Sequence, residues 1–239
     1  MILHDTCAAI EHFGRAVTGS NNIRFVAVGG PTAVGKSTLS RQFLAEAVRL
    51  GVPAFVLEGD RFLVPQKDRP HPASFPDDVY EIERLRTAVS AIADGQSFRA
   101  PFYERDGRHT GRFTVRPGED ASEILSLCHA RACSDQNELV IDQEEVLEVV
   151  ALRDGVWILD SELALLYEDF LPLYDLSYGL RASRSVRKSH FMHAVERGER
   201  YPYLTELEAR AKIEGFWQTD DALIEPTVLR ADVQIELAT

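Results

Sequence analysis

The stretch from Gly30 to Ser37 reads Gly-Pro-Thr-Ala-Val-Gly-Lys-Ser and fits the spacing G-x-x-x-x-G-K-[ST]. Its glycines let the backbone curl so that successive N–H groups face one anion. Lys36 would add a positive charge beside the terminal phosphates of a nucleoside triphosphate, and the Ser37 hydroxyl could coordinate Mg²⁺. The sequence therefore predicts a phosphate-binding loop, whose cofactor-binding residues are Gly30, Pro31, Thr32, Ala33, Val34, Gly35, Lys36, Ser37 and Thr38.

This loop alone does not separate kinases from other nucleotide-hydrolysing proteins. The sequence contains neither the guanine-reading N-K-x-D nor the D-x-x-G of GTPase switches, and it lacks the L-S-G-G-Q of transporter ATPases. A small-molecule or nucleotide kinase and a regulatory nucleotide-binding protein remain.

Two aspartates follow apolar runs and are candidates for the chemistry. Asp60 comes just after the run 54–57, where a carboxylate could take the proton of an acceptor hydroxyl. Asp160 directly follows the run 156–159, where an acid could hold the water shell of Mg²⁺. The alternatives are a loop-capping role for Asp60 and a helix N-cap role for Asp160, and Glu162 is a second candidate for the metal.

A basic run interrupts this otherwise acidic sequence between 181 and 200. Arg184, Arg187 and Lys188 have spacings that place them on one helical face, and Arg197 follows. Their guanidinium groups could stabilise charge on a transferring phosphoryl group from a helical lid. The alternative is an ordinary solvated helix.

The elements that must position these residues follow from hydrophobic periodicity. Strands are predicted at 24–30, 54–57, 156–159, 176–180 and 231–235, and helices at 3–17, 39–50, 82–92, 119–132, 183–197 and 205–217. Residues 98–118 are expected to be extended and looped, and residues 138–152 alternate only weakly. The pattern predicts an α/β fold of the P-loop NTPase type, with a doubly wound, mainly parallel sheet and a helical lid. We expect one domain over 1–239 with an insertion or cap at about 106–155.

Composition limits the partners of the chain. Its 239 residues carry a formal net charge of −12, which disfavours extended binding to nucleic acid or anionic lipid. No apolar run approaches the roughly 18 residues of a membrane span. The three cysteines form no C-x-x-C, and the spacing of Cys128, His129 and Cys133 fits no common zinc pattern, so we expect ordinary thiols in a reducing, cytoplasmic compartment. A homodimer is a further hypothesis.

With these residues assembled, the chain resembles the uridine kinase and phosphoribulokinase family of P-loop kinases. Asp60-Arg-Phe-Leu63 is similar to the D-x-F-Y motif, whose aspartate is the catalytic base in that family. His71-Pro-Ala-Ser-Phe75 resembles the family's H-P-x-A-F. Pro101-Phe-Tyr103 matches P-x-Y, whose tyrosine lines the acceptor pocket.

The resemblance continues after the middle of the chain, with departures. Glu196-Arg-Gly198 is similar to the E-R-G after the lid arginines, and 224–226 with 231–233 resemble the closing segment near the adenine. Where uridine kinases have Phe-Asp before H-P, this chain has Arg69-Pro70, so a plain nucleoside acceptor is in doubt. Asp160-Ser161 replaces a Glu-Gly, and Lys188 replaces the aspartate of an R-D pair.

Several arginines fall in the segments that should border the acceptor: Arg61, Arg69, Arg105, Arg108 and Arg112. They suggest an acceptor with a negative charge, such as a sugar phosphate, and the alternative is solvated arginines on loops. The substrate-binding residues predicted here are Arg61, Arg69, His71, Tyr103 and Arg105.

The sequence thus predicts an ATP- and Mg²⁺-dependent kinase for a hydroxyl of a small metabolite: a sugar, a sugar phosphate or a nucleoside-like molecule. The predicted catalytic residues are Asp60, Lys36, Arg184, Arg187 and Arg197, and the predicted metal ligands are Ser37 and Asp160. The alternatives are a zeta-toxin-like kinase acting on a sugar nucleotide or a protein, and a regulatory ATP-binding protein without acceptor chemistry.

Overall fold

The computed structural model describes residues 1–19, 22–105, 110–131, 137–201 and 203–237. The chain forms two compact units: Met1–Gly59 together with Asp154–Thr239, and Asp60–Arg153. The second unit contains most of the segment 106–155 that we expected to be an insertion.

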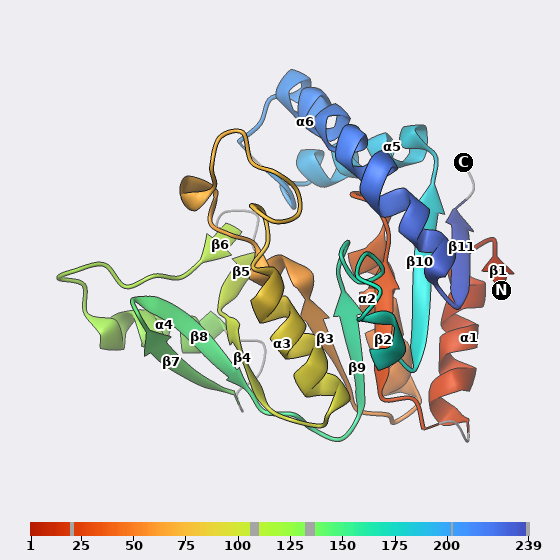
Figure 1. Ribbon diagram of the computed structural model, residues 1–239, viewed down its shortest axis with the longest axis horizontal. Helices are drawn as coiled ribbons and strands as arrows, with labels where there is room; N and C mark the ends of the chain where they lie inside the picture. Colours follow the sequence, from red (N-terminus) through yellow and green to blue (C-terminus); the bar gives the residue numbers. More distant parts are fainter. Residues whose placement is uncertain (20–21, 106–109, 132–136, 202, 238–239) are drawn as a thin grey trace. The chain divides into compact units, whose positions relative to one another are not determined.

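The first unit is built on a six-stranded sheet, with the strands in the order β1-β11-β10-β2-β9-β3 and every neighbouring pair parallel. Figure 1 shows β2 between β9 and β10. The strands are β1 (Ile2–Leu3), β2 (Phe25–Gly29), β3 (Ala54–Glu58), β9 (Val156–Asp160), β10 (Leu176–Ala182) and β11 (Val233–Leu237). The predicted parallel sheet is therefore confirmed. The two-residue β1 was not predicted, because so short a strand has no periodicity.

The helices of this unit match the predicted ones to within a few residues. They are α1 (Thr6–Thr18), α2 (Lys36–Arg49), α5 (Arg184–Glu196) and α6 (Glu206–Thr219). Short turns complete the unit at η3 (Leu171–Leu173), η4 (Asp220–Ile224) and η5 (Glu225–Arg230). Side chains at the N-caps explain where three of the helices begin: Asp5 caps α1, Ser183 caps α5, and Thr205 forms a capping box with Glu208 at α6.

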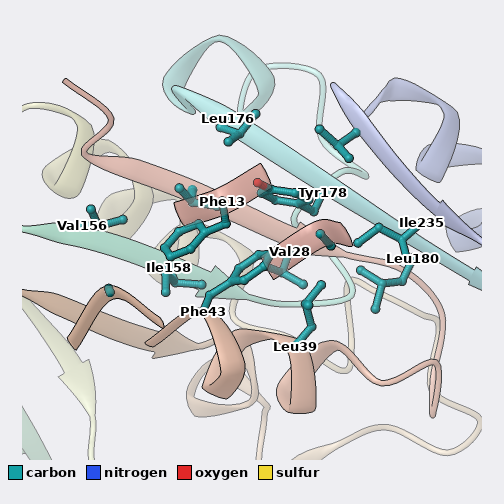
Figure 2. Packing of buried hydrophobic residues seen from close by; sticks show 14 of the residues in the cluster. Phe13, Val28, Leu39, Phe43, Val156, Ile158, Leu176, Tyr178, Leu180 and Ile235 are labelled. Atoms are coloured by element: carbon teal, nitrogen blue, oxygen red, sulfur yellow. The ribbon is translucent and has the colours of Figure 1, made fainter. Parts of the chain in front are cut away.

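Helices α1 and α2 cover one face of the sheet, and their aromatic side chains fill the core there. Phe13 of α1 stacks on Phe43 of α2 with ring centroids 4.4 Å apart, in one cluster with Val28, Ile158 and Tyr178 (Figure 2). Burying each such side chain stabilises the fold by about 1.5–3 kcal/mol. The sheet thus fixes the carboxyl end of β2, from which the phosphate loop emerges.

The opposite face of the sheet is covered by irregular segments that approach its backbone. A Cβ atom added at Gly29 would come within 2.6 Å of Leu165, and one added at Gly179 would come within 2.7 Å of the carbonyl oxygen of Val228. Both faces are therefore buried, as the continuous apolar strands require.

The second unit is smaller and antiparallel. Strands β4 (Phe98–Pro101), β8 (Glu145–Val150) and β7 (Glu138–Asp142) form one sheet in that order, and β5 (Tyr103–Arg105) pairs with β6 (Thr110–Arg112). Helices α3 (Ile82–Ala93) and α4 (Ala121–Arg131) and the turn η2 (Gln66–Asp68) complete it, while η1 (Gly59–Phe62) spans the boundary. A small core gathers around Phe102, Cys128, Leu139 and Val146.

Across the described residues, no helix combines the length and apolar character that a membrane crossing needs.

Candidate functional site

The loop between β2 and α2 adopts backbone conformations that its sequence allows. Gly30 has φ +141°, and a Cβ there would lie 2.6 Å from the carbonyl oxygen of Leu180. Gly35 has φ +104°, and Ala33 also takes a left-handed conformation at φ +61°. Only glycine fits at position 30, because the backbone of β10 fills the space where a side chain would stand.

Helix α2 begins at Lys36 without a side-chain cap. The first N–H groups of a helix have no intrahelical acceptor, and the N-cap of α2, Gly35, offers no side chain that could accept from them. Together with the positive end of the helix dipole, such N–H groups form a ready site for an anion. The helix start therefore fits a phosphate group.

The Lys36 side chain folds back over the loop. Its Nζ donates to the carbonyl oxygens of Gly30 at 2.9 Å and of Pro31 at 3.0 Å. Ser37 is half-buried at the first turn of α2, and Thr38 is exposed. The loop therefore combines three features that fit the phosphates of a nucleoside triphosphate. They are a backbone curled at its glycines, a helix start without a side-chain cap, and an adjacent lysine.

Asp160 ends strand β9 next to the strand that leads into the loop. It is paired in register with Val28 of β2 and with Glu58 of β3, and it is 7% exposed. The other predicted candidate, Glu162, accepts a hydrogen bond from the Thr32 hydroxyl at 3.3 Å. Among the described residues no group of three or more His, Cys, Asp or Glu side chains could hold a metal by itself. That is compatible with Mg²⁺ bound by few protein ligands together with substrate phosphates.

The structure places Arg187 inside the protein, against the phosphate loop. Its side chain is fully buried, and its Nε donates to the Thr32 carbonyl oxygen at 3.0 Å. The guanidinium also donates to the carboxylates of Asp220 and, at 3.4 Å, of Asp221. Arg187 thus contacts the loop itself, whereas its predicted role at the transferring phosphoryl group stays a prediction.

The other two predicted lid arginines lie at the surface. Arg184 binds the Asp221 carboxylate through Nε and Nη2, and its guanidinium lies over the Trp217 ring, 5.2 Å from the centroid. Both residues line a hollow of about 530 Å³, together with Glu214, Gln218, Asp221 and Ala222. Arg197 is held by Glu199 through two hydrogen bonds of 2.7 and 2.9 Å.

Asp220 is a buried acid that the sequence did not single out. Its Oδ2 accepts from the Thr32 N–H at 3.1 Å, and its Oδ1 from the Thr32 hydroxyl at 3.3 Å. Burial raises the pKa of the Asp220 carboxyl above its ordinary value, although the charges of Arg187 and Lys36 and the Thr32 hydrogen bonds act in the opposite direction. The carboxylate is therefore held beside the loop against the cost of removing it from water.

In the second unit, the predicted base follows β3 at the start of the unit. Asp60 lies half-buried in η1, and its carbonyl oxygen accepts from the Leu63 N–H at 3.2 Å. Arg61 forms an ion pair with Glu148, and the Nε of Arg69 donates to the Val64 carbonyl oxygen at 2.8 Å. His71 is exposed.

The hairpin of β5 and β6 carries the other predicted acceptor residues. Tyr103 is the cross-strand partner of Arg112, whose Nη1 donates to Glu81 at 2.8 Å and to Glu145 at 3.0 Å. Arg105 lies in β5, but its side chain, like residues 106–109 and therefore Arg108, lies outside the described part. Cys133 lies outside it as well. Because Arg61 and Arg112 are paired with glutamates, their charges are balanced within this unit.

Sequence reasoning missed the acidic partners of the arginines, namely Glu148, Asp220 and Asp221. Asp220 and Asp221 do follow a predicted helix, but two adjacent aspartates in a polar segment are equally typical of a solvent-exposed turn. Glu148 stands in a weakly alternating segment. The only usable signal was indirect: buried arginines need carboxylates, and the sequence does not say which arginine is buried.

Neither a family model nor a curated protein matches this chain. Solved structures do match it in fold. A candidate fructose transport system kinase from Silicibacter sp. TM1040 is 15% identical, with a TM-score of 0.58, and the match covers 97% of this chain and 99% of that one. A protein described as a possible uridine kinase from Bacillus stearothermophilus is 14% identical, with a TM-score of 0.52 and coverage of 96% and 98%. Phosphoribulokinase from Rhodobacter spheroides is 15% identical, with a TM-score of 0.55 and coverage of 91% and 71%.

These likenesses extend over nearly the whole chain, including both units. The chain has an α/β fold of the P-loop NTPase type, as found in P-loop kinases of the uridine kinase and phosphoribulokinase-like group. The fold class and the fold resemblance predicted from the sequence are thereby confirmed.

Proposed function

We propose that this chain is an ATP- and Mg²⁺-dependent phosphotransferase acting on an alcohol group of a small metabolite: a sugar, a sugar phosphate or a nucleoside-like molecule. One observation carries the proposal. The carboxyl end of β2 leads through a loop with glycines at φ +141° and +104° into an uncapped helix that begins with Lys36. This arrangement suits an anion, and the fold that contains it is shared with kinases.

In this proposal the residues of the first unit hold the phosphates. Lys36 leaves its two carbonyl acceptors and turns to the β- and γ-phosphates, and the amide groups at the start of α2 receive the same anion. Ser37 and Asp160 would hold Mg²⁺, which would neutralise phosphate charge when bound. Arg184 and Arg197, whose present partners are the half-buried Asp221 and the exposed Glu199, would stabilise charge on the transferring group.

The acceptor residues of the proposal belong to the second unit. Asp60 would accept the proton of the attacking hydroxyl while the oxygen forms its bond to the γ-phosphorus and ADP leaves. Tyr103, His71, Arg61, Arg69 and Arg105 are the proposed acceptor contacts. Arg61 is paired with Glu148, so its charge is already balanced. This pairing supports a role for Arg61 in orienting the acceptor rather than in binding a negatively charged group on it.

The test is an acceptor screen combined with a change at the base. Nucleosides, sugars, sugar phosphates and hydroxy acids are offered with ATP and Mg²⁺, and acceptor-dependent ADP release is measured. With the best acceptor, we expect Asp60→Asn to lower kcat by about 10²–10⁴ because general-base catalysis is lost. ATP affinity, measured by calorimetry, should stay near that of the wild type.

The matched control is Asp94→Asn, which changes an exposed aspartate that follows α3. Normal turnover by Asp60→Asn would refute the base assignment. If no small acceptor accelerates ADP release, the proposal fails as stated. Phosphorylation of a sugar nucleotide or a protein would then favour the toxin-like alternative, and ATP binding without transfer would favour a regulatory protein.

A further inference from the structure

The Thr32 peptide of the phosphate loop is held on two sides by residues far away in the sequence. Its N–H donates to Asp220 at 3.1 Å, and its carbonyl oxygen accepts from Arg187 at 3.0 Å. Arg187 comes from α5 and Asp220 from η4. The two side chains also bind each other, so they close a ring around a single residue of the loop.

This ring is buried. Arg187 is 0% exposed and Asp220 is 3% exposed. Replacing a buried ion pair by apolar side chains is often neutral or stabilising, so stability alone gives little reason to place two charges here. Burial also raises the pKa of Asp220, which agrees with a carboxylate held at a cost.

The residue after Thr32 explains what the ring could do. Ala33 has φ +61°, a left-handed conformation that is unfavourable for residues other than glycine. Such conformations persist only where surrounding contacts fix them, and they gather at ligand sites. A fixed Thr32 peptide on one side and helix α2 on the other provide that constraint. Because Asp220 occupies the Thr32 N–H, this amide is not among the donors left for a phosphate.

We infer that Arg187 and Asp220 are positioning residues of the phosphate loop: by fixing the Thr32 peptide they hold the following turn, and so the amides at the start of α2, in the arrangement that receives a triphosphate. The inference rests on the proposed function to the extent that the ligand is a triphosphate. It extends that proposal by assigning to Arg187 the support of the phosphate loop. It also adds Asp220, which no sequence motif indicated.

The experiment uses the full chain with Asp220→Asn and Arg187→Lys. The control is Glu214→Gln, which removes the exposed ion pair of Lys188 and Glu214 between α5 and α6 without touching Thr32. Dissociation constants for ATP and for inorganic tripolyphosphate are measured by calorimetry, and the ¹⁵N–¹H signals of Thr32, Ala33 and Lys36 are followed by NMR.

We expect both loop variants to bind ATP and tripolyphosphate about tenfold more weakly, by the same factor for the two ligands. We also expect kcat to fall by up to about 10²-fold, because shifts of an ångström in a positioned group have effects of that size. The Thr32 and Ala33 signals should move in both variants. Glu214→Gln should leave affinities and signals unchanged.

The outcomes separate the inference from the proposed function. Equal affinities in wild type, Asp220→Asn and Arg187→Lys would overturn the inference while ATP binding itself stands. A wild type that binds neither ATP nor tripolyphosphate would overturn the proposed function. The NMR signals would then decide the remaining structural claim, because an unmoved Thr32 amide in Asp220→Asn would show that the ring does not hold the peptide. A lowered Tm with unchanged affinities would reduce the pair to a purely structural role and so refute the inference.

Discussion

Each unit of the molecule contains a buried carboxylate paired with an arginine, and the two carboxylates have opposite pKa shifts. In the first unit burial raises the pKa of Asp220, beside a fully buried Arg187. In the second unit burial would also raise the pKa of Glu148. The charge of Arg61, the hydrogen bond from Asn137 and the charge of Arg153 outweigh this effect, and the pKa is lowered.

The difference lies in how far the surrounding charges and hydrogen bonds offset the burial of each carboxylate. Glu148 accepts from Asn137 at 2.6 Å and from Arg61, and the Arg61 side chain keeps 22% of its surface in water. Asp220 shares Arg187 with Asp221 and with the Thr32 carbonyl oxygen. In its ionised form Glu148 therefore stabilises the fold. The charge on Asp220 instead costs stability, and we infer that its role is to hold Thr32 of the phosphate loop.

The largest expected effect on the stability of the fold comes from neutralising Glu148. Glu148→Gln keeps the shape of the side chain but removes its charge, and hydrogen bonds to charged groups are worth about 1.5–3 kcal/mol. For a chain of this size that loss lowers Tm by several degrees, since about 1 kcal/mol shifts Tm by about 2–4 °C. Thermal and urea unfolding at pH 7 measure it.

Asp220→Asn is the matched control for this substitution. Because the pKa of Asp220 is raised, the folded protein favours its neutral form more than the unfolded chain does, and the amide should leave Tm unchanged or raise it. Equal losses of stability in the two variants would contradict the contrast between the units.

The pH dependence of these variants provides a second test with a defined sign. The folded pKa of Glu148 lies below its ordinary value of 4.5. Its contribution to stability is therefore present above about pH 4.5 and is lost as the pH falls through the folded pKa. The difference in unfolding free energy between wild type and Glu148→Gln should shrink in that window and vanish at lower pH.

Asp220 should behave in the opposite way. Its folded pKa lies above 3.8, so its favourable contribution is present below pH 3.8 and is lost as the pH rises through the folded pKa. Wild type and Asp220→Asn should therefore be equally stable in acid and diverge as the pH rises, to the disadvantage of the wild type. Urea unfolding between pH 3 and pH 7 tests both signs, and parallel curves for wild type and Glu148→Gln would argue against the pair in the second unit.

The same contrast explains what the sequence could and could not predict. The phosphate loop is a contiguous motif between a continuous apolar strand and an amphipathic helix, and these local signals place it correctly at the end of β2. Strands β2 and β9 were equally visible, because each is a continuous apolar run buried on both faces. The site roles assigned to Asp60, Asp160 and the lid arginines remain predictions, as do the single-domain organisation and the cytoplasmic location.

Partners of the charged side chains were beyond the reach of sequence patterns. Arg187 and Arg184 differ by one helical turn, yet one is fully buried and the other has 61% of its side chain exposed. Helical spacing places both on one face but does not say how deeply the face is covered. The antiparallel second unit was harder still, since its strands are three to six residues long and the turn that joins β7 to β8, Gln143-Glu144, contains no glycine to mark it.

The turn between β7 and β8 provides the smallest expected effect and tests the second unit alone. Asp142 pairs with Glu145, so Gln143 and Glu144 form a two-residue connection, and both have positive φ values of +49° and +68°. Such hairpin turns strongly favour Asn-Gly, because a left-handed conformation costs other residues about 1–2 kcal/mol. Glu144→Gly should therefore raise the unfolding free energy by about 1 kcal/mol, less the extra freedom that glycine gives the unfolded chain.

The control for this turn is Gly155→Ala in the first unit. Gly155 has φ +148°, and a Cβ there would lie 2.5 Å from the carbonyl oxygen of Pro53, so the opposite exchange should lower stability. Urea unfolding of the two variants measures both signs. Glu144→Gly is compared with wild type in both stability and ATP affinity: a gain in stability at unchanged ATP affinity would show that the strain in this hairpin has no role in nucleotide binding. The strain at Ala33 differs, because its neighbour Thr32 is held by a buried ion pair. Loss of stability in Glu144→Gly would instead show that the left-handed turn is not strained.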